Sequence, residues 1–191
     1  KNTLIISFGT ACLSLILAIP LSWLLTRTDV PNQSRWRSLF CLPYAIPPYI
    51  GAMAWIYLAN PTNGIINQII GTSFLNIYTT SGLIWVMSSF FYTFILLSLL
   101  AALDRMDPSL EEAARLSGAN PFQVFYHITL PIIFPSLMSG VLLVLLAAAA
   151  SFGVPAMIGN PARLFLVTTK IYTYQRMGSL SGIYMAGALS A

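Results

Sequence analysis

Two adjacent glutamates, Glu111 and Glu112, open the most informative segment of this 191-residue chain. Ala113 and Ala114 follow Glu112 directly, and Gly118 comes after three further residues. Alanines are small enough for close approach to another surface, and a carboxylate can form a charge-assisted hydrogen bond with a basic group there. The spacing therefore predicts binding chemistry.

The residues around the glutamates predict how the segment folds. Asp107 before Pro108 is typical of an N-cap followed by proline at the first helical position, and Ser109 with Glu112 offers an alternative capping box. Both glutamates then lie in the first turn, where the helix dipole favours negative charge. Gly118 stands where a left-handed residue would end the helix.

A second helix is predicted from Asn120 and Pro121, which repeat the cap-plus-proline pattern. Its spacing puts four residues on one face before Pro131 begins the next hydrophobic stretch: Phe122, Phe125, Tyr126, and Thr129 or Leu130. The expected arrangement is helix, glycine turn and helix, parallel to a membrane surface. His127 lies in the second helix, and without a nucleophile or a second ligand beside it we expect packing or a hydrogen bond from it.

The composition of the whole chain indicates an integral membrane protein. Hydrophobic residues make up 57% and charged residues 7%, with a mean hydropathy of +0.78, far from the roughly 25% charged content of soluble domains. The uncharged run from Ser38 to Leu103 would measure about three bilayer cores as one helix, so it must fold back. A dispersed net charge of +4 gives no reason to expect nucleic-acid binding.

Hydrophobic stretches predict four spans and the start of a fifth, from Ser181: about Leu4 to Leu25, Ser38 to Ala59, Ser81 to Leu103, and Ile132 to Ser151. Three prolines, Pro43, Pro47 and Pro48, should kink or break the second span, because each removes a backbone donor. The chain starts without Met and ends inside an apolar run, so we treat it as a fragment.

Charge counting gives little information on orientation. With the glutamate segment taken as cytoplasmic, five basic residues lie inside and four outside, which is barely a bias. Orientation therefore depends on the motif.

Residues 112–131 resemble the EAA signature of permease subunits of binding-protein-dependent ABC importers. The shared pattern is Glu-Ala-Ala, three residues, Gly, nine residues and Ile-x-Leu-Pro. The resemblance implies an all-α integral membrane protein, a polytopic bundle of about five spans with a MetI-like permease core. It implies one transmembrane permease domain over residues 1–191, with a cytoplasmic coupling loop at about 104–131. The residues that would couple to an ATPase are Glu111, Glu112, Ala113, Ala114, Gly118, Ile128, Leu130 and Pro131.

The same resemblance implies partners and a location. Expected partners are ABC ATPase subunits, a second permease half in the same or another chain, an extracytoplasmic substrate-binding protein and the lipid bilayer. ATP and Mg²⁺ would be bound by the ATPase, and this chain would bind no cofactor and act as a non-catalytic subunit of the bacterial inner membrane. Closure of the ATPase would push on the loop and tilt the third and fourth spans.

Other stretches resemble the ferric-iron permeases, whose relatives carry thiamine or polyamines. These stretches are residues 42–49, 151–156 and 168–172. Ferric iron is therefore the expected cargo, with polyamine, thiamine or an inorganic anion as alternatives. The absence of acids from the spans argues against a metal cage of carboxylates there. Candidates for lining or gating the pathway lie beside proline or glycine irregularities: Tyr44, Tyr49, Ser151 and Phe152.

A different class of protein, an aquaporin-like channel, would account for two Asn-Pro motifs. Residues 160–163 read Asn-Pro-Ala-Arg, and Asn60-Pro61 precedes them by a hundred residues. In a water channel each Asn caps a half-helix within the membrane, but Lys170 and Arg176 follow too soon for comfortable burial. Plain turn chemistry explains both motifs as well.

Overall fold

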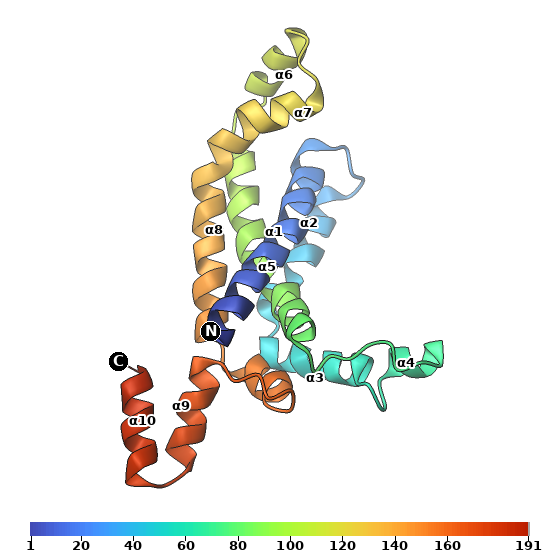
Figure 1. Cartoon of the computed structure of the whole chain (residues 1–191). Helices are drawn as coiled ribbons and strands as arrows, with labels where there is room; N and C mark the ends of the chain where they lie inside the picture. The colour runs from blue at the N-terminus through green and yellow to red at the C-terminus, as the bar shows by residue number, and fades with distance from the viewer. Residues whose placement is uncertain (191) are drawn as a thin grey trace.

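A computed structural model describes residues 1–190, and within that range every regular element is a helix and none is a strand (Figure 1). Three long helices form the bundle: α1 (Asn2–Arg27), α5 (Thr80–Arg105) and α8 (Leu130–Ala150). They are apolar and long enough to cross a membrane when α8 is taken with the helical turns that precede it. This architecture confirms the predicted all-α membrane fold.

Helix α5 lies at the centre of the bundle and packs against both α1 and α8. Its inward residues are fully buried, among them Leu83, Ile95 and Leu99. Small residues let the neighbouring helices come close: a Cβ added to Gly140 of α8 would lie 2.9 Å from the Cα of Ile95. Such contact maximises dispersion between helices in a medium where the hydrophobic effect contributes little.

Helix α8 begins at Leu130, close to the predicted start of the fourth span at Ile132, and the chain preceding it is also helical. Helix α7 (Pro121–Val124) passes through a π-helical turn, η2 (Phe125–Thr129), directly into α8. Pro131 removes one backbone donor, but it stands at the second residue of α8, and the wider turn before it absorbs the change.

The predicted second span is broken as its prolines require. Helix α2 (Gln33–Cys41) and the 3₁₀ turn η1 (Leu42–Ala45) meet α3 (Pro48–Ala59) at an angle of 96°. One straight helix from Ser38 to Ala59 is therefore not formed, and the helical part already begins at Gln33, before the predicted start of the span. The bent pair would make a fourth span if both halves lie in the membrane.

The remaining elements lie at the end of the bundle away from α6 and α7 (Figure 1). They are α4 (Ile65–Ile70), the π turn η3 (Pro155–Gly159), α9 (Val167–Arg176) and α10 (Leu180–Ser190). Helix α10 begins where the fifth span was predicted, and it packs against α9.

Both Asn-Pro motifs lie in turns, and neither Asn begins a helix. Asn60 Oδ1 accepts hydrogen bonds from the backbone N–H and the hydroxyl of Thr62, at 2.9 and 2.8 Å. Asn160 ends η3, and its carbonyl accepts the N–H of Arg163 at 3.0 Å. Turn chemistry therefore accounts for both motifs.

Candidate functional site

The loop between α5 and α8 contains α6 (Ser109–Leu116), whose N-cap residue is Pro108 and not Asp107 or Ser109 as the sequence predicted. Asp107 Oδ1 accepts the backbone N–H of Ser109 at 2.9 Å. This hydrogen bond, followed by one from the Ser109 hydroxyl, lowers the pKa of Asp107 below its ordinary value of 3.8. The carboxylate thus satisfies one of the free donors of the first turn.

Gly118 ends α6 in the left-handed conformation predicted for it, with φ of +88°. The chain then turns into α7, where Asn120 and Gln123 form a reciprocal capping box. The N–H of Gln123 donates to Asn120 Oδ1 at 2.8 Å, and the N–H of Asn120 donates to Gln123 Oε1 at 2.9 Å. The predicted sequence of helix, glycine turn and helix is confirmed.

Glu111 points into the protein, which its position beside Glu112 did not reveal. The residue is 3% exposed. Its Oε2 lies 2.9 Å from Nε of Arg27, the last residue of α1, and its Oε1 accepts the hydroxyl of Thr129 at 2.7 Å. We call these three residues the Glu111 junction, because they join α1, α6 and η2.

Glu112 and Ala113, which follow Glu111 on α6, are exposed. The same loop exposes large apolar side chains: Leu116 of α6 is 90% exposed and Phe122 of α7 is 80% exposed. We call this surface, which also includes Tyr126, the exposed loop face. A protein rarely leaves a cluster of large apolar groups uncovered unless another surface binds it.

The predicted single face of the second loop helix is wrong. Phe122 and Tyr126 are exposed, whereas Phe125 packs edge-on against Trp23 of α1 with ring centroids 5.2 Å apart, and Thr129 is buried. The π turn widens the helix, and residues at helical spacing therefore no longer line up. Among the other predicted coupling residues, Ala114, Ile128 and Leu130 are partly buried and Pro131 is exposed.

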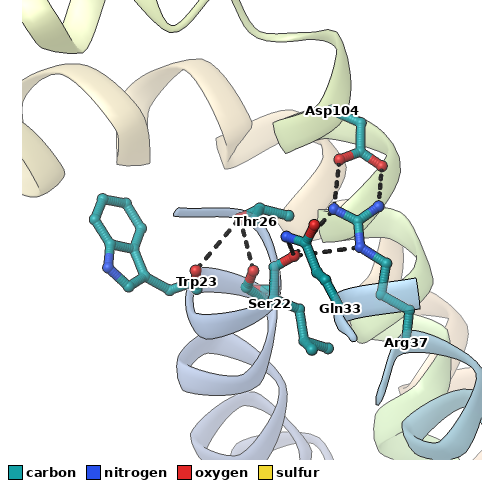
Figure 2. Close-up of polar contacts among 7 residues, drawn as sticks. Ser22, Trp23, Thr26, Gln33, Arg37 and Asp104 are labelled. Carbon is teal, nitrogen blue, oxygen red and sulfur yellow. Dashed lines mark hydrogen bonds and ion pairs between the residues drawn. The ribbon is translucent and has the colours of Figure 1, made fainter. Parts of the chain in front are cut away.

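A second polar cluster holds the loop end of the bundle together (Figure 2). The guanidinium of Arg37, on α2, donates to both carboxylate oxygens of Asp104, on α5, at 2.7 and 2.9 Å. It also donates to the carbonyl of Leu25 near the end of α1 at 3.0 Å, and Gln33 donates to the same carbonyl. Arg27 and Arg37 are two of the five basic residues counted as inside in the sequence analysis, and nothing in their spacing predicted these partners.

A polar cavity of about 540 Å³ lies between α6 and the connection from α1 to α2. Arg27, Asp29, Glu111, Glu112 and Arg115 are among the residues that line it. Positive and negative groups alternate around it, so it does not favour a ligand of one charge.

Three of the four pathway candidates lie near one another at the opposite end of the bundle. Tyr49 packs on Gly153, where an added Cβ would approach its Cβ to 3.0 Å. Phe152 contacts Tyr172 with ring centroids 5.1 Å apart, and the Ser151 carbonyl accepts the Thr168 hydroxyl at 2.8 Å. Tyr44, on η1, packs instead against Phe94 of α5. Their role in a pathway stays a prediction.

Comparison with known protein families identifies the family of this chain. The model of the family described as "Binding-protein-dependent transport system inner membrane component" matches residues 8–191. The chain belongs to this family. Membership in a family of membrane transport components, and not of enzymes, confirms the predicted class and the inner-membrane, multi-pass location.

Curated relatives are similar over most of this chain. The chloroplastic sulfate permease 2 of Chlamydomonas reinhardtii is 32% identical over 84% of the chain, which spans 43% of that relative. The sulfate transport system permease protein CysT of Salmonella typhimurium is 25% identical, and the match covers 99% of this chain and 71% of that relative. The sn-glycerol-3-phosphate transport system permease protein UgpA of Salmonella choleraesuis is 29% identical, and the match covers 93% of this chain and 61% of that relative. The chain thus spans about half to two thirds of these relatives' length.

Solved structures show the same fold. An inward-facing form of the MetNI methionine ABC transporter matches with a TM-score of 0.70 at 22% identity, covering 98% of this chain and 84% of that one. A bacterial alginate ABC transporter in complex with an alginate-bound periplasmic protein matches with a TM-score of 0.76 at 21% identity, covering 100% and 70%. With the family match, these likenesses leave the water-channel alternative without support.

Proposed function

We propose that this chain is the permease part of an ATP-driven importer and forms half of its translocation pathway. The observation that carries the proposal is the exposed loop face, with Leu116 at 90% and Phe122 at 80% exposure beside the exposed Glu112. A rigid helical hairpin that presents apolar groups and one carboxylate suits a groove on a separate ATPase with a basic group. ATP and Mg²⁺ would bind to that ATPase.

The loop would convert ATPase movement into movement of the spans. It is joined to α5 on one side and, through the continuous helix of α7 and η2, to α8 on the other. A helix transmits displacement along its axis better than an irregular linker does. Displacement of the exposed loop face should therefore tilt α8 and alternate access to the pathway.

The cargo is best described as a small oxyanion, because the relatives above are named for sulfate and for sn-glycerol-3-phosphate. None of those three is named for ferric iron, the cargo expected from the sequence. The inorganic-anion alternative therefore has better support than iron.

Charge distribution agrees with an anionic cargo. All five acids lie at the loop end with five arginines, so the net charge of +4 belongs to four basic residues elsewhere: Lys1, Arg163, Lys170 and Arg176. These four lie at the opposite end, where the N–H of Val167, at the start of α9, donates to the Thr3 hydroxyl at 3.0 Å. A positive mouth attracts anions and repels a free ferric cation.

The test is reconstitution of the full-length permease with its ATPase and binding protein in proteoliposomes. We expect ATP-dependent uptake of radiolabelled sulfate or glycerol phosphate and none of ferric iron. Glu112→Ala should reduce ATPase binding by about tenfold, as loss of one charge-assisted hydrogen bond predicts. Asp29→Ala is the matched control, because Asp29 is an exposed acid at the same end outside the loop. Unchanged ATPase binding in Glu112→Ala, or uptake of iron alone, would contradict the proposal.

A further inference from the structure

Helix α1 is separated from the loop in the chain by α2 to α5, yet it is held to α6 by the Glu111 junction. We propose that Glu111 and Arg27 are positioning residues that make α1 move with the loop, so that three helices respond to the ATPase. This inference rests on the proposed function, and it extends the expectation that only the spans flanking the loop are driven.

Burial makes the ion pair a durable link. The Arg27 and Glu111 side chains are 11% and 4% exposed. Separating two buried opposite charges leaves each without water or a counter-charge, which is far less favourable than moving them together. A displacement of α6 should therefore carry the end of α1 with it.

The pair tolerates small rotations because it is mainly Coulombic. Nε of Arg27 lies 2.9 Å from Glu111 Oε2, but neither Nε nor Nη2 forms a well-aligned hydrogen bond within the described residues. Coulomb attraction falls gradually with distance and does not depend on the donor angle. A hydrogen bond weakens steeply when the donor angle becomes poor. The link can thus persist while α6 tilts.

Other contacts fix the two ends of the pair. Thr129 donates to the second oxygen of Glu111, which orients the carboxylate from the chain that leads into α8. On the α1 side, Arg37 joins the Leu25 carbonyl to Asp104 of α5. Trp23 packs on Phe125 one turn before Arg27. Helix α1 is therefore connected to both of the other long helices at this end.

Neighbouring glutamates make the test unusually well controlled. Glu112 differs from Glu111 by one position, faces outward, and should matter for ATPase binding. Glu111 faces inward and should matter for transmission after binding. The two substitutions therefore separate the proposed function from the further inference.

The experiment uses the full-length transporter in lipid nanodiscs and proteoliposomes. For Glu111→Gln and Arg27→Gln we expect ATPase binding close to that of the parent, with transport per ATP hydrolysed reduced by about fivefold or more, the lower end of typical coupling factors. The double variant R27E/E111R restores the opposite charges in reversed positions and should regain much of the ratio. A merely structural role would lower the amount of assembled protein and leave the ratio unchanged.

Distance measurements supply an independent readout. Leu24 of α1 and Leu110 of α6 are both 48% exposed, and Leu24→Cys with Leu110→Cys gives spin-label sites once Cys12 and Cys41 are replaced by serine. We expect the distance between labels to be the same in nucleotide-free and ATP-bound states, and to differ between states in Glu111→Gln. Thr129→Val, a milder change, tests the link if the charge variants fail to assemble.

An unchanged transport-to-ATP ratio in Glu111→Gln, or a parent distance that changes between states, would overturn the inference while the proposed function stands. A parent transporter that binds no ATPase would overturn both.

Discussion

The interior of the helix bundle and its loop end are held together by different interactions. In the interior, α1, α5 and α8 meet through buried aliphatic side chains and small residues, with Gly140 against the backbone at Ile95. At the loop end, caps and ion pairs dominate: Asp107, Glu111 and Asp104 each bind a specific donor.

These two kinds of interaction differ in how far they allow the helices to shift. Close-packed helices resist deformation, because any change in their separation loses contacts or creates overlap. Polar pairs at a half-exposed end can exchange with water at modest cost. A rigid bundle suits a machine in which whole helices move, with the half-exposed Arg37–Asp104 pair free to rearrange and the buried Glu111 junction kept intact.

The largest effect that would break this comparison is expected in the interior. Gly140→Val should destabilise the bundle by about 1–3 kcal/mol or more, since its Cβ would lie 2.9 Å from the Ile95 Cα. Thermal unfolding in detergent measures it. Gly187→Val is the matched control, because this glycine in α10 has no heavy atom within 4 Å of an added Cβ. Equal losses in the two variants would show that close helix contact is not the cause.

At the loop end, Gly118→Val should have a local effect of about 1–2 kcal/mol, the cost of a left-handed β-branched residue. Space is not the problem, since nothing lies within 4 Å of an added Cβ at φ of +88°. Hydrogen exchange should quicken in residues 107–124 while the melting temperature of the bundle stays the same. Gly118→Asn should be milder, because asparagine tolerates this conformation; equal effects would argue against backbone strain.

A smaller effect, about 1 kcal/mol at most, is expected from the ion pair between Arg37 and Asp104. Their side chains are 29% and 46% exposed, so solvent screens most of the attraction. Arg37→Ala should cost more stability than Asp104→Ala, because Arg37 also binds the Leu25 carbonyl. Unfolding in denaturant at low and high salt measures both, and a larger loss in Asp104→Ala would show that the carbonyl contact is unimportant.

The smallest expected effect concerns pH at the start of α6. Hydrogen bonds from Ser109 lower the pKa of Asp107 below 3.8, so the folded state binds a proton less readily than the unfolded state. The capping contribution is therefore complete above pH 3.8 and is lost as pH falls through the lowered pKa. The amide signal of Ser109 in a nuclear magnetic resonance titration should follow this loss. Asp107→Asn should abolish the titration, and persistence would assign it to another group.

Much of the fold followed from local chemistry. Length and polarity predicted the long helices, the prolines predicted the break between η1 and α3, and Gly118 predicted the turn, because each depends on backbone geometry within a few residues. The continuous helix through Pro131 was not predicted, since a π turn depends on how the neighbouring helices pack. The common face expected for Phe122 and Thr129 failed for the same reason.

The sequence by itself determined the membrane class, the hairpin of α6 and α7, and the family signature within it. Only the tertiary structure decided which of two adjacent glutamates faces inward and which arginine meets it. Arg27 and Glu111 are far apart in the chain, and no local rule of capping or periodicity connects them. Their pairing follows from the crossing of α1 and the loop, which depends on the packing of the whole bundle.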